Sequence, residues 1–405
     1  MDWLTSPEAE QLLTNLPPYD EGSALSITRQ LRAKGVDAEH IRTILTQSRL
    51  RSKARSRWGD IADQLILTSD GAEQSTRPVA AAHRARRYAN AGVDHAADLG
   101  CGLALDAMAL AAHGVTVTAF ERDEVTAAAA RANVASLGFG DVVEVRCADV
   151  TGLRFGTEEG FDGVYADPAR RRDGRRISSP EQWSPPLSWV LNLPASSLGV
   201  KVAPGLAHDL VPAGSEFEVV SIDGDVVEAG IYRGELRSQD VSRRATLLPD
   251  GSTLTDHDLP GEPVPTAAVG RYLYEPAGAV IRSGLVAAVA DQMDGWLIDP
   301  LIAYISSDAE RVSPYARGYH VLSVMPFNVK KLRAHLRSNG VGRITIKKRG
   351  SAIEPETLRR QLHLDRSQSG EATVVATRLG QDPVMLLVEP LTLVEPPTLV
   401  EPLTE

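Results

Sequence analysis

The sequence contains few residues that support covalent, metal or membrane chemistry. Its 405 residues include two cysteines, Cys101 and Cys147, and no Cys-x-x-Cys pair. Two cysteines cannot form the disulfide framework of a small secreted domain, and they fit a reducing cytoplasm. The nine histidines show no pairing at metal-ligand spacing, so we expect no metal site. No apolar run reaches the length of a membrane span, and the first residues lack the features of a signal peptide.

Positive charge is also scarce when the whole chain is counted. Lys and Arg number 43 against 53 Asp and Glu, which gives a net charge of −10. This charge would repel nucleic acid on average, so binding of nucleic acid would need local basic patches. The chain is longer than one ordinary domain, and its hydrophobic fraction of 43% is enough for two or three packed cores.

The segment from Asp98 to Glu121 predicts a nucleoside site. It begins with a strand end and a tight turn at Gly100 and Gly102, and continues with a helix over 103–112 and a second strand that ends at Glu121. The glycines let the backbone turn sharply and approach a ligand, and the free N–H groups of the helix point at that ligand. Glu121 follows Asp98 by 23 residues, near the spacing at which an acid meets a ribose diol.

The details of the turn discriminate between two kinds of nucleoside. A dinucleotide site would have a third glycine at position 105, where this chain has Leu105. The carboxylate of Asp98 would repel a pyrophosphate, whereas it would favour a cationic amino-acid moiety. The Asp-x-Gly-x-Gly pattern of residues 98–102 resembles the first motif of class I S-adenosylmethionine (SAM) methyltransferases. Ala104 stands where many members of that family have a further glycine.

The resemblance implies an α/β fold with a Rossmann-like, mostly parallel sheet that ends in an antiparallel hairpin. Two more predicted strands end in acids, so four successive strands end at Asp98, Glu121, Asp149 and Asp167. Such acids converge at the carboxyl edge of an open sheet, where ligands bind. The family places at the position of Asp149 an acid that accepts a hydrogen bond from the adenine amino group. The resemblance implies that SAM is held by Asp98, Gly100, Gly102, Glu121 and Asp149.

Residues 167–170 form the segment that would hold the methyl acceptor. They resemble the Asp/Asn-Pro-Pro-Tyr/Phe motif of amino-directed nucleic-acid methyltransferases, in which the acid and the next carbonyl bind the target amine. Asp167 and Pro168 match the first two positions of this motif, which bind the amine, and they are the predicted catalytic residues. Ala169 and Arg170 stand in place of the second proline and the aromatic residue. An arginine plane can still stack on a base or bind phosphate. Neither cysteine follows this strand, which disfavours a covalent cytosine-C5 mechanism.

Two local basic patches lie in the first half of the chain. Residues 29–57 carry nine Lys or Arg against two acids, on predicted helices that could be a nucleic-acid arm or a solvated face. A run beside the predicted acceptor site is expected to contact substrate phosphate. Its members are Arg170, Arg171, Arg172, Arg175 and Arg176.

In related methyltransferases a Thr-Pro-type turn lies near the methionine end of SAM, which makes Thr76 a candidate for cofactor contact.

The C-terminal part predicts a separate α/β module over 319–390. Residues 325–333 and 344–350 resemble the THUMP-like domain attached to some bacterial class I methyltransferases. This resemblance implies an RNA substrate, with contacts from Lys347, Lys348 and Arg349, although basic residues on a strand can also protect an edge against aggregation. The tail repeats a Val-Glu-Pro unit, whose prolines favour an extended chain.

The sequence thus predicts five regions and one main function. The regions are a basic helical region (1–70), a SAM-binding core (71–240), a connecting region (241–318), the THUMP-like domain (319–390) and the tail (391–405). The expected function is that of a cytoplasmic SAM-dependent methyltransferase acting on RNA, at a base nitrogen. Two alternatives remain: a methyltransferase of a small molecule or protein, and a SAM-binding RNA-binding protein without catalysis. The sequence does not indicate an oligomeric state.

Overall fold

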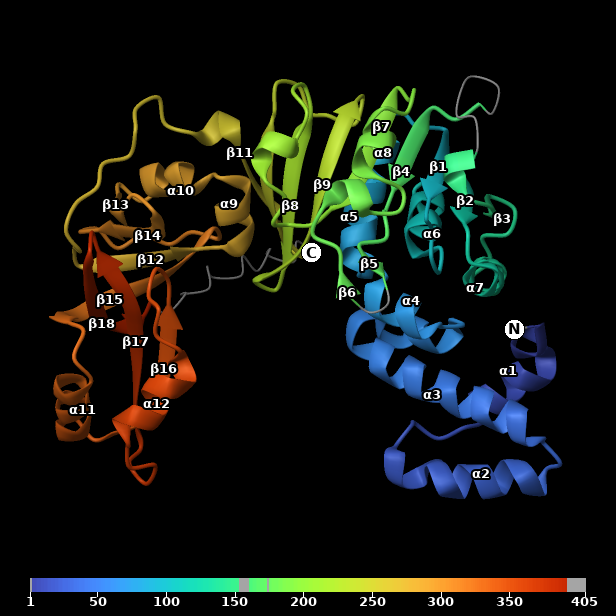
Figure 1. Cartoon of the computed structure of the whole chain (residues 1–405), viewed down its shortest axis with the longest axis horizontal. Coiled ribbons are helices and arrows are strands. Elements are labelled where there is room, and N and C mark those ends of the chain that lie inside the picture. The colour runs from blue at the N-terminus through green and yellow to red at the C-terminus, as the bar shows by residue number, and fades with distance from the viewer. Residues whose placement is uncertain (1, 153–159, 173–174, 392–405) are drawn as a thin grey trace, which may run out of the picture. The chain divides into compact units, whose positions relative to one another are not determined.

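The computed structural model describes residues 2–152, 160–172 and 175–391 (Figure 1). The chain divides into two compact units. The first comprises residues 1–222 and 227–242, and the second comprises 223–226 and 243–405. Most of the tail expected from residue 391 lies outside the described residues. Within those residues, no helix is both long and apolar enough to cross a membrane.

The first unit contains a twisted sheet whose strands follow the order β8-β9-β7-β4-β1-β2-β3. The pairs from β7 to β3 are parallel, and β7 pairs antiparallel with β9, so the predicted fold class is confirmed. The hairpin between β8 and β9 turns at Asp223 and Gly224, both with positive φ, as a two-residue turn requires. The strands are β1 (His95–Leu99), β2 (Thr116–Glu121), β3 (Val143–Cys147), β4 (Gly163–Ala166), β7 (Ser197–Val202), β8 (Glu216–Ile222) and β9 (Asp225–Gly234).

Helices cover this sheet, and one begins later than its sequence predicts. The helices are α5 (Pro78–Asn90), α6 (Leu105–Ala112), α7 (Glu124–Ser136) and the short α8 (Leu187–Leu191). The sequence predicts that the helix after the glycine turn starts at Leu103, but α6 starts at Leu105. The reason is Ala104, whose φ of 64° and ψ of 22° are left-handed and cannot belong to a right-handed helix.

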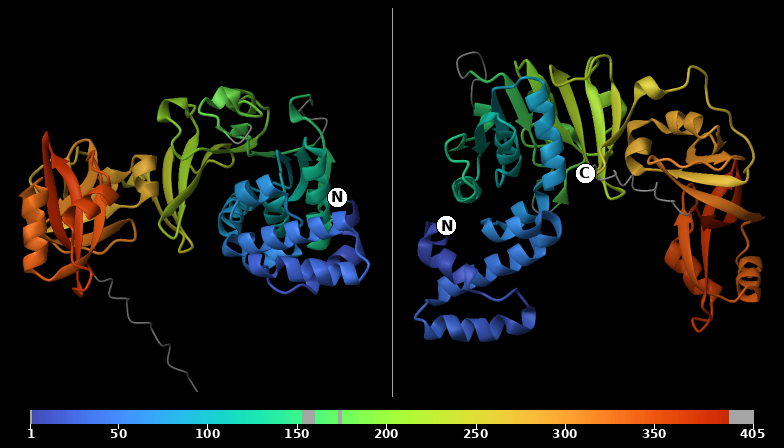
Figure 2. Two further views of the ribbon diagram at one scale, coloured as in Figure 1. Left: turned by 60° about the horizontal axis from the view of Figure 1, so that its bottom comes forward. Right: turned by 180° about the vertical axis from the view of Figure 1, so that it is seen from behind.

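Four further helices precede the sheet and pack against α7 and the glycine turn. They are α1 (Pro7–Thr14), α2 (Ala24–Ala33), α3 (Ala38–Trp58) and α4 (Ser69–Gln74), seen in blue in Figures 1 and 2. Their apolar core includes Leu103 of the glycine turn and Ala129 of α7. The buried amide of Asn133 also joins them to the sheet layer, because its Oδ1 accepts from Ile66 N (2.7 Å) and its Nδ2 donates to Ile66 O (3.1 Å) and Leu103 O (3.3 Å). The helical region and the glycine turn therefore share one core.

The second unit contains a seven-stranded sheet in the order β13-β14-β12-β15-β18-β17-β16. Residue 319, the expected start of a separate module, lies within β15, where Tyr319 is fully buried against Leu273 and Tyr304. The strands before it therefore belong to the same sheet. The strands are β12 (Tyr272–Pro276), β13 (Trp296–Asp299), β14 (Ile302–Ser307), β15 (Ala316–Pro326), β16 (Val341–Lys348), β17 (Gly370–Leu379) and β18 (Asp382–Pro390).

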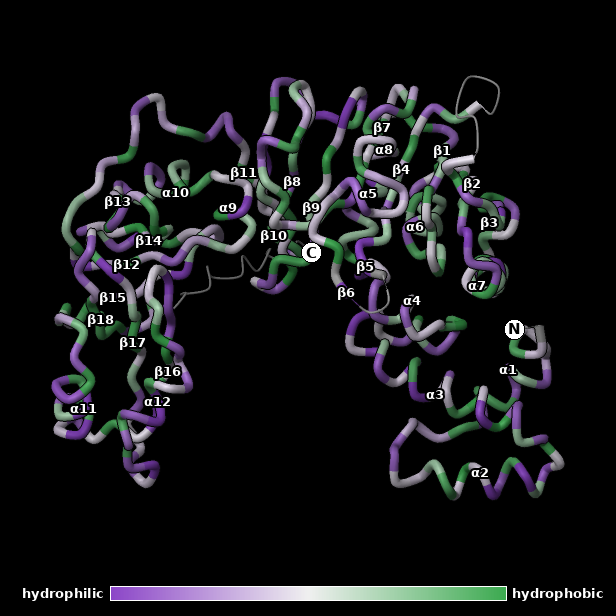
Figure 3. The backbone as a smooth tube through the Cα atoms, viewed as in Figure 1, coloured by the Kyte–Doolittle hydropathy of each residue, from purple (hydrophilic) through white to green (hydrophobic). Residues whose placement is uncertain are grey.

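Helices and a hairpin complete the second unit. The hairpin of β10 (Arg243–Leu248) and β11 (Ser252–Thr255) turns at Asp250 and Gly251, as the sequence predicts. The helices are α9 (Gly278–Ser283), α10 (Val286–Gln292), α11 (Val329–Ser338) and α12 (Pro355–Leu362). Leucines of α11 and α12 are buried in one core with residues of β17 and β18. The rest of both helices is strongly hydrophilic (Figure 3).

Candidate active site

The glycine turn between β1 and α6 has the conformation that the sequence predicts. Gly100 and Gly102 have φ of 83° and 56°, in the region that glycine adopts without strain. A Cβ on Gly100 would lie 3.3 Å from the carbonyl oxygen of Asp167, so the turn lies directly against the end of β4. The N–H groups of Gly100 and Cys101 both donate to Phe120 O at 2.9 Å, which fixes the turn on the neighbouring strand β2.

Asp98 is a buried carboxyl group without a partner. Its side chain is inaccessible to solvent, and neither carboxyl oxygen has a hydrogen bond from any residue that the structure describes. Burial, followed by the nearby carboxyls of Asp106 and Asp167, raises its pKa well above the ordinary value. Because buried polar groups are nearly always hydrogen-bonded, this carboxyl is suited to receive a cationic donor.

Glu121 and Asp149 lie at the ends of the next two strands. Glu121 accepts from Gly102 N (3.1 Å) and Asp123 N (2.9 Å), which leaves half of the acceptor capacity of its carboxylate for other donors. The exposed Asp149 accepts from Thr151 N (2.9 Å) and Thr151 Oγ1 (2.7 Å), and these bonds lower its pKa. The strand ends are adjacent, since Ala148 N donates to Glu121 O at 3.0 Å. The structure thus places the four predicted acids at the carboxyl edge of β4-β1-β2-β3.

Asp167 is held by a lysine that the sequence motifs do not include. Lys201 Nζ of β7 lies 2.7 Å from Asp167 Oδ2, and the lysine side chain is buried. Burial by itself lowers the pKa of Lys201, but the carboxylates of Asp167, Glu228 and Asp106 outweigh it and raise that pKa above the ordinary value. Lys201 is therefore a cation whose position fixes one oxygen of Asp167.

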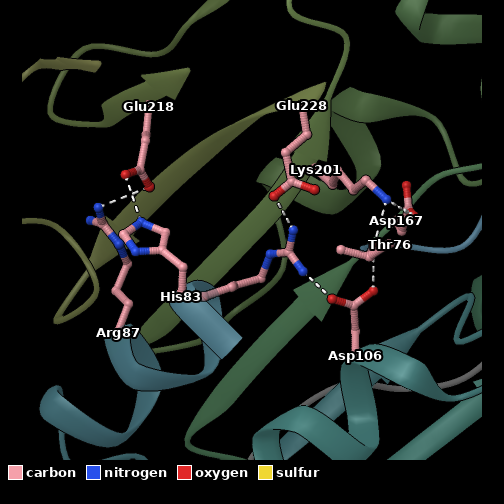
Figure 4. A network of polar contacts seen from close by, with 9 residues as sticks. Thr76, His83, Arg87, Asp106, Asp167, Lys201, Glu218 and Glu228 are labelled. Carbon is pink, nitrogen blue, oxygen red and sulfur yellow. Dashed lines mark hydrogen bonds and ion pairs between the residues drawn. The ribbon is translucent and has the colours of Figure 1, made fainter. Parts of the chain in front are cut away.

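The same lysine begins a chain of polar contacts across the interior (Figure 4). Lys201 donates to Thr76 Oγ1 at 2.8 Å, and Thr76 donates to Asp106 Oδ2 at 2.7 Å. The guanidinium of Arg84 bridges Asp106 and Glu228. Thr76, a candidate for cofactor contact, thus connects Asp167 to helices α5 and α6. Four carboxyl groups at 98, 106, 167 and 228 surround two cations, Arg84 and Lys201, so the site has surplus negative charge.

The arginine run forms a small hairpin directly after Asp167-Pro168. Strands β5 (Arg171–Arg172) and β6 (Arg175–Arg176) pair antiparallel, and Arg170 O accepts from Ile177 N at 2.8 Å. Arg170 is half-buried, whereas Arg171 and Arg175 are exposed. The side chains of Arg172 and Arg176 lie outside the described residues. The run therefore begins at the end of the strand that carries the predicted catalytic residues.

The predicted RNA contacts of the second unit are held by carboxylates. Lys347 and Arg349 lie 2.5 Å and 3.7 Å from Glu275, and Lys348 lies 2.5 Å from Glu354. Arg349 also lies over the ring of Tyr304. These three side chains therefore already pair with carboxylates of the protein, which leaves less of their charge for RNA.

Three family models match separate parts of the chain. A family model described as a methyltransferase domain matches residues 97–168, one described as THUMP domain-like matches 316–390, and a domain of unknown function matches 1–54. An uncharacterized S-adenosylmethionine-dependent methyltransferase of Mycobacterium tuberculosis strain H37Rv is 34% identical over 340 residues, which cover 82% of this chain and 91% of the relative.

The chain belongs to the SAM-dependent methyltransferases.

A crystal structure shows the same fold for this methyltransferase. This crystal structure is of a protein from Porphyromonas gingivalis W83 that is named as a candidate methyltransferase. The two structures match with a TM-score of 0.72 and 22% sequence identity, and the match covers 93% of this chain and 100% of that chain. The predicted resemblance to methyltransferases with a THUMP-like domain is confirmed.

The residues of the site fit the cofactor SAM. SAM carries a sulfonium and an ammonium group, and the surplus of carboxyl groups around Asp98 matches a cationic ligand. The unpartnered carboxyl of Asp98 would receive the cationic amino-acid end, and the remaining acceptor capacity of Glu121 suits the hydroxyls of a ribose. Among the described residues, no group of three His, Cys, Asp or Glu could hold a metal ion.

Sequence analysis missed three residues of the methyltransferase site. Lys201, Arg84 and Asp106 form the buried network but belong to no motif. One signal was available for the first of them, since Lys201 interrupts the apolar strand of residues 198–203. A lysine in a buried strand needs a carboxylate partner, and Asp167 is at the end of the adjacent strand.

Proposed function

We propose that this methyltransferase acts on RNA, at the exocyclic or ring nitrogen of a base. The observation that carries the proposal is the position of Asp167-Pro168. This pair directly follows β4, and the carbonyl of Asp167 lies against the glycine turn that would hold the cofactor. An acceptor bound at Asp167 would therefore lie next to the methyl donor.

The residues of this site would act by positioning the acceptor. When bound, SAM supplies a methyl group that is already activated for transfer. Asp167 Oδ2 is held by Lys201, and Oδ1 accepts no hydrogen bond from the described residues, so it is available to a target N–H. The carbonyl of Pro168 would accept a second N–H from the same amine. Alignment of acceptor and donor supplies much of the rate of such a reaction, so no nucleophilic side chain is needed.

Two features support RNA as the substrate class. The THUMP domain-like match over residues 316–390 favours an RNA partner, because THUMP domains are RNA-binding modules. The arginine hairpin that follows Asp167-Pro168 exposes Arg171 and Arg175, which suit phosphate contact. We place the reaction in the cytoplasm, since both cysteines are free.

The experiment uses RNA from cells that lack this protein. The purified chain is incubated with this RNA and methyl-labelled SAM, and the digested nucleosides are identified by mass spectrometry. We expect label in one modified nucleoside. Asp167→Ala should reduce the transfer at least ~100-fold, because a misplaced acceptor loses alignment, while RNA binding is retained.

Asp141→Ala is the matched control, since Asp141 is exposed and lies outside the site. Its transfer rate should equal that of the wild type. Label in a protein or a small molecule instead of RNA would favour the other methyltransferase class. RNA binding by the wild type without transfer to any RNA would favour an RNA-binding protein without catalysis.

A further inference from the structure

The second unit contains a cavity with a mostly basic wall. Its volume is about 520 Å³, and it lies beside β16, the last strand of the sheet, whose outer edge has no partner strand among the described residues. Five basic side chains from three successive segments line it, and all five are exposed. They are Arg343 of β16, Arg359 and Arg360 of α12, and His363 and Arg366 of the following loop.

A glycine in β16 lets the loop form the wall of this cavity. A Cβ on Gly342 would lie 2.1 Å from Gln368 O and 2.8 Å from Asp365 O, so the loop packs directly on the strand. The register between β16 and β17 shifts at the same position, between Val341 and Arg343. Such an irregularity changes the direction of the neighbouring side chains, and here the neighbour is Arg343.

His363 is held in a strained conformation at the end of α12. Its φ of 43° and ψ of 51° are left-handed, where a helix end usually has glycine or asparagine. Arg337 of α11 donates to His363 O at 2.6 Å, and Arg333 donates to Gln361 O, so α11 holds this loop in place. Non-glycine residues in such conformations cluster at functional sites, and His363 is one of the residues that line the cavity.

The positive charge of the cavity is only partly neutralised. Arg343 lies 2.7 Å from Glu371, but both side chains are about 70% exposed, so the pair is weak. Arg359 pairs with Glu356 of its own helix. Arg360 and Arg366 have no carboxylate partner among the residues that the structure describes. Favourable charge at a helix C-terminus explains Arg359 and Arg360, but it does not explain why Arg343 and Arg366 face the same space.

We propose that this cavity binds the phosphodiester backbone of a single-stranded segment of RNA; the choice of RNA rests on the proposed function. Its volume lies within the range of pockets that hold small organic ligands, so it accommodates a nucleotide unit rather than one inorganic ion. Guanidinium groups bind phosphate in a bidentate manner, and their planes also stack on bases. The predicted contacts Lys347 and Lys348 are paired with carboxylates instead, so the cavity is the stronger phosphate site of this domain.

The test measures fluorescence anisotropy of the full chain with a labelled single-stranded RNA of about 15 nucleotides. The variant combines Arg360→Gln and Arg366→Gln. We expect its Kd to rise at least ~10-fold at moderate salt. The slope of log affinity against log salt should fall by about 1.4, because each phosphate contact on a single strand contributes about 0.7.

The matched control combines Lys330→Gln and Lys331→Gln, which removes two exposed charges from α11 outside the cavity. Its Kd should change less than ~3-fold. Equal effects of the two double variants would overturn the proposal, as would competition by poly-glutamate as strong as that by unlabelled RNA. The latter result would indicate a site for acidic peptides.

A second variant separates binding from folding. His363→Gly relieves the left-handed strain, so we expect a higher melting temperature together with weaker RNA binding. Unchanged binding in this variant would remove the imidazole from the site. All these measurements record binding without methyl transfer, so failure of the RNA methylation assay and failure of the cavity proposal are separate results.

Discussion

The strand ends around Asp98 and the cavity beside β16 both gather charged side chains, but with opposite sign and opposite exposure. Around Asp98 the carboxyl groups outnumber the cations, and Lys201 and Arg84 are buried. In the cavity the arginines are exposed, and two of them have no carboxylate partner among the described residues. Buried charges depend on specific partners at short range, whereas exposed charges attract a polyanion and are screened by salt. The first arrangement suits one small cation, and the second suits a long anionic chain.

Removal of a buried cation should have the largest effect. Lys201→Met leaves Asp167 with neither its ion pair nor full hydration, so we expect a loss of about 3–5 kcal/mol in the free energy of unfolding. Methyl transfer should be lost as well, since Asp167 is no longer fixed. Urea unfolding measures the stability. The double variant Lys201→Met with Asp167→Asn should recover part of it, because the uncompensated charge is gone.

An exposed ion pair provides the comparison for this prediction. Lys348→Met removes the pair with Glu354, whose side chain is 69% exposed. The expected cost is at most about 1 kcal/mol. Equal costs for Lys348→Met and Lys201→Met would contradict the distinction between the buried and exposed regions.

Substitution of Asp98 should separate stability from cofactor affinity. Asp98→Asn removes a buried carboxyl that has no partner among the described residues, so the melting temperature should stay the same or rise. A hydrogen bond between charged groups contributes about 1.5–3 kcal/mol, so SAM affinity should fall roughly 10–150-fold. Asp149→Asn, at an exposed strand end, should lower the affinity only about 5-fold. Calorimetry with unchanged SAM affinity in Asp98→Asn would remove Asp98 from the site.

The raised pKa of Asp98 also predicts a pH dependence. Burial, then Asp106 and Asp167, raises this pKa, so the folded chain keeps a proton that the unfolded chain has lost. As the pH rises from the ordinary Asp pKa to the raised value, the contribution of Asp98 to stability therefore decreases. A bound cation favours the ionised carboxyl, so cofactor binding should release a proton, and affinity should increase with pH over the same window. Calorimetry in two buffers with different ionisation enthalpies detects this proton, and Asp98→Asn should abolish it.

A smaller effect is expected from a methyl group in the glycine turn. Gly100→Ala forces a left-handed alanine, at a cost of about 1–2 kcal/mol, and places its Cβ 3.3 Å from Asp167 O. Gly92 is a matched control because its φ is also positive (72°), but a Cβ there meets nothing within 4 Å. Both variants should lose similar stability, and only Gly100→Ala should lose methyl transfer. Equal activities would show that the close approach to Asp167 is not needed.

The sequence predicted the core of the first unit because its signals are local. Asp98, Gly100 and Glu121 lie within one strand-turn-helix-strand segment, and the acids at 149 and 167 end the next strands along the chain. Their spacing alone determines which edge of a parallel sheet they share. The fold class could therefore be predicted without knowledge of tertiary contacts, and the resemblance to the first methyltransferase motif added the cofactor.

Contacts between distant segments could not be predicted in this way. Lys201 meets Thr76 across 125 residues, and Arg84 meets Glu228 across 144. The resemblance and the charge of residues 347–349 predict RNA contact, but Glu275, far away in the sequence, pairs with Lys347 and Arg349. The cavity combines one or two arginines from each of three segments, none of which forms a conspicuous run. A site that is built from residues far apart in the sequence can be recognised only in the folded structure.

The hydrogen bonds of Asn133 have a consequence for synthesis of the chain. The helices of residues 7–74 leave the ribosome before the glycine turn and α7, but Leu103 and Ala129 complete their apolar core. The backbone N–H of Ile66 likewise has its hydrogen-bond acceptor only after Asn133 has been made. Domains generally fold as units during translation. Here the first helices complete their core only after the glycine turn and α7 have been made, so the nascent N-terminal region carries an incomplete core while the segment from α5 to α7 is synthesised. A nascent chain stalled before α7 should accordingly recruit chaperones that bind exposed apolar surface.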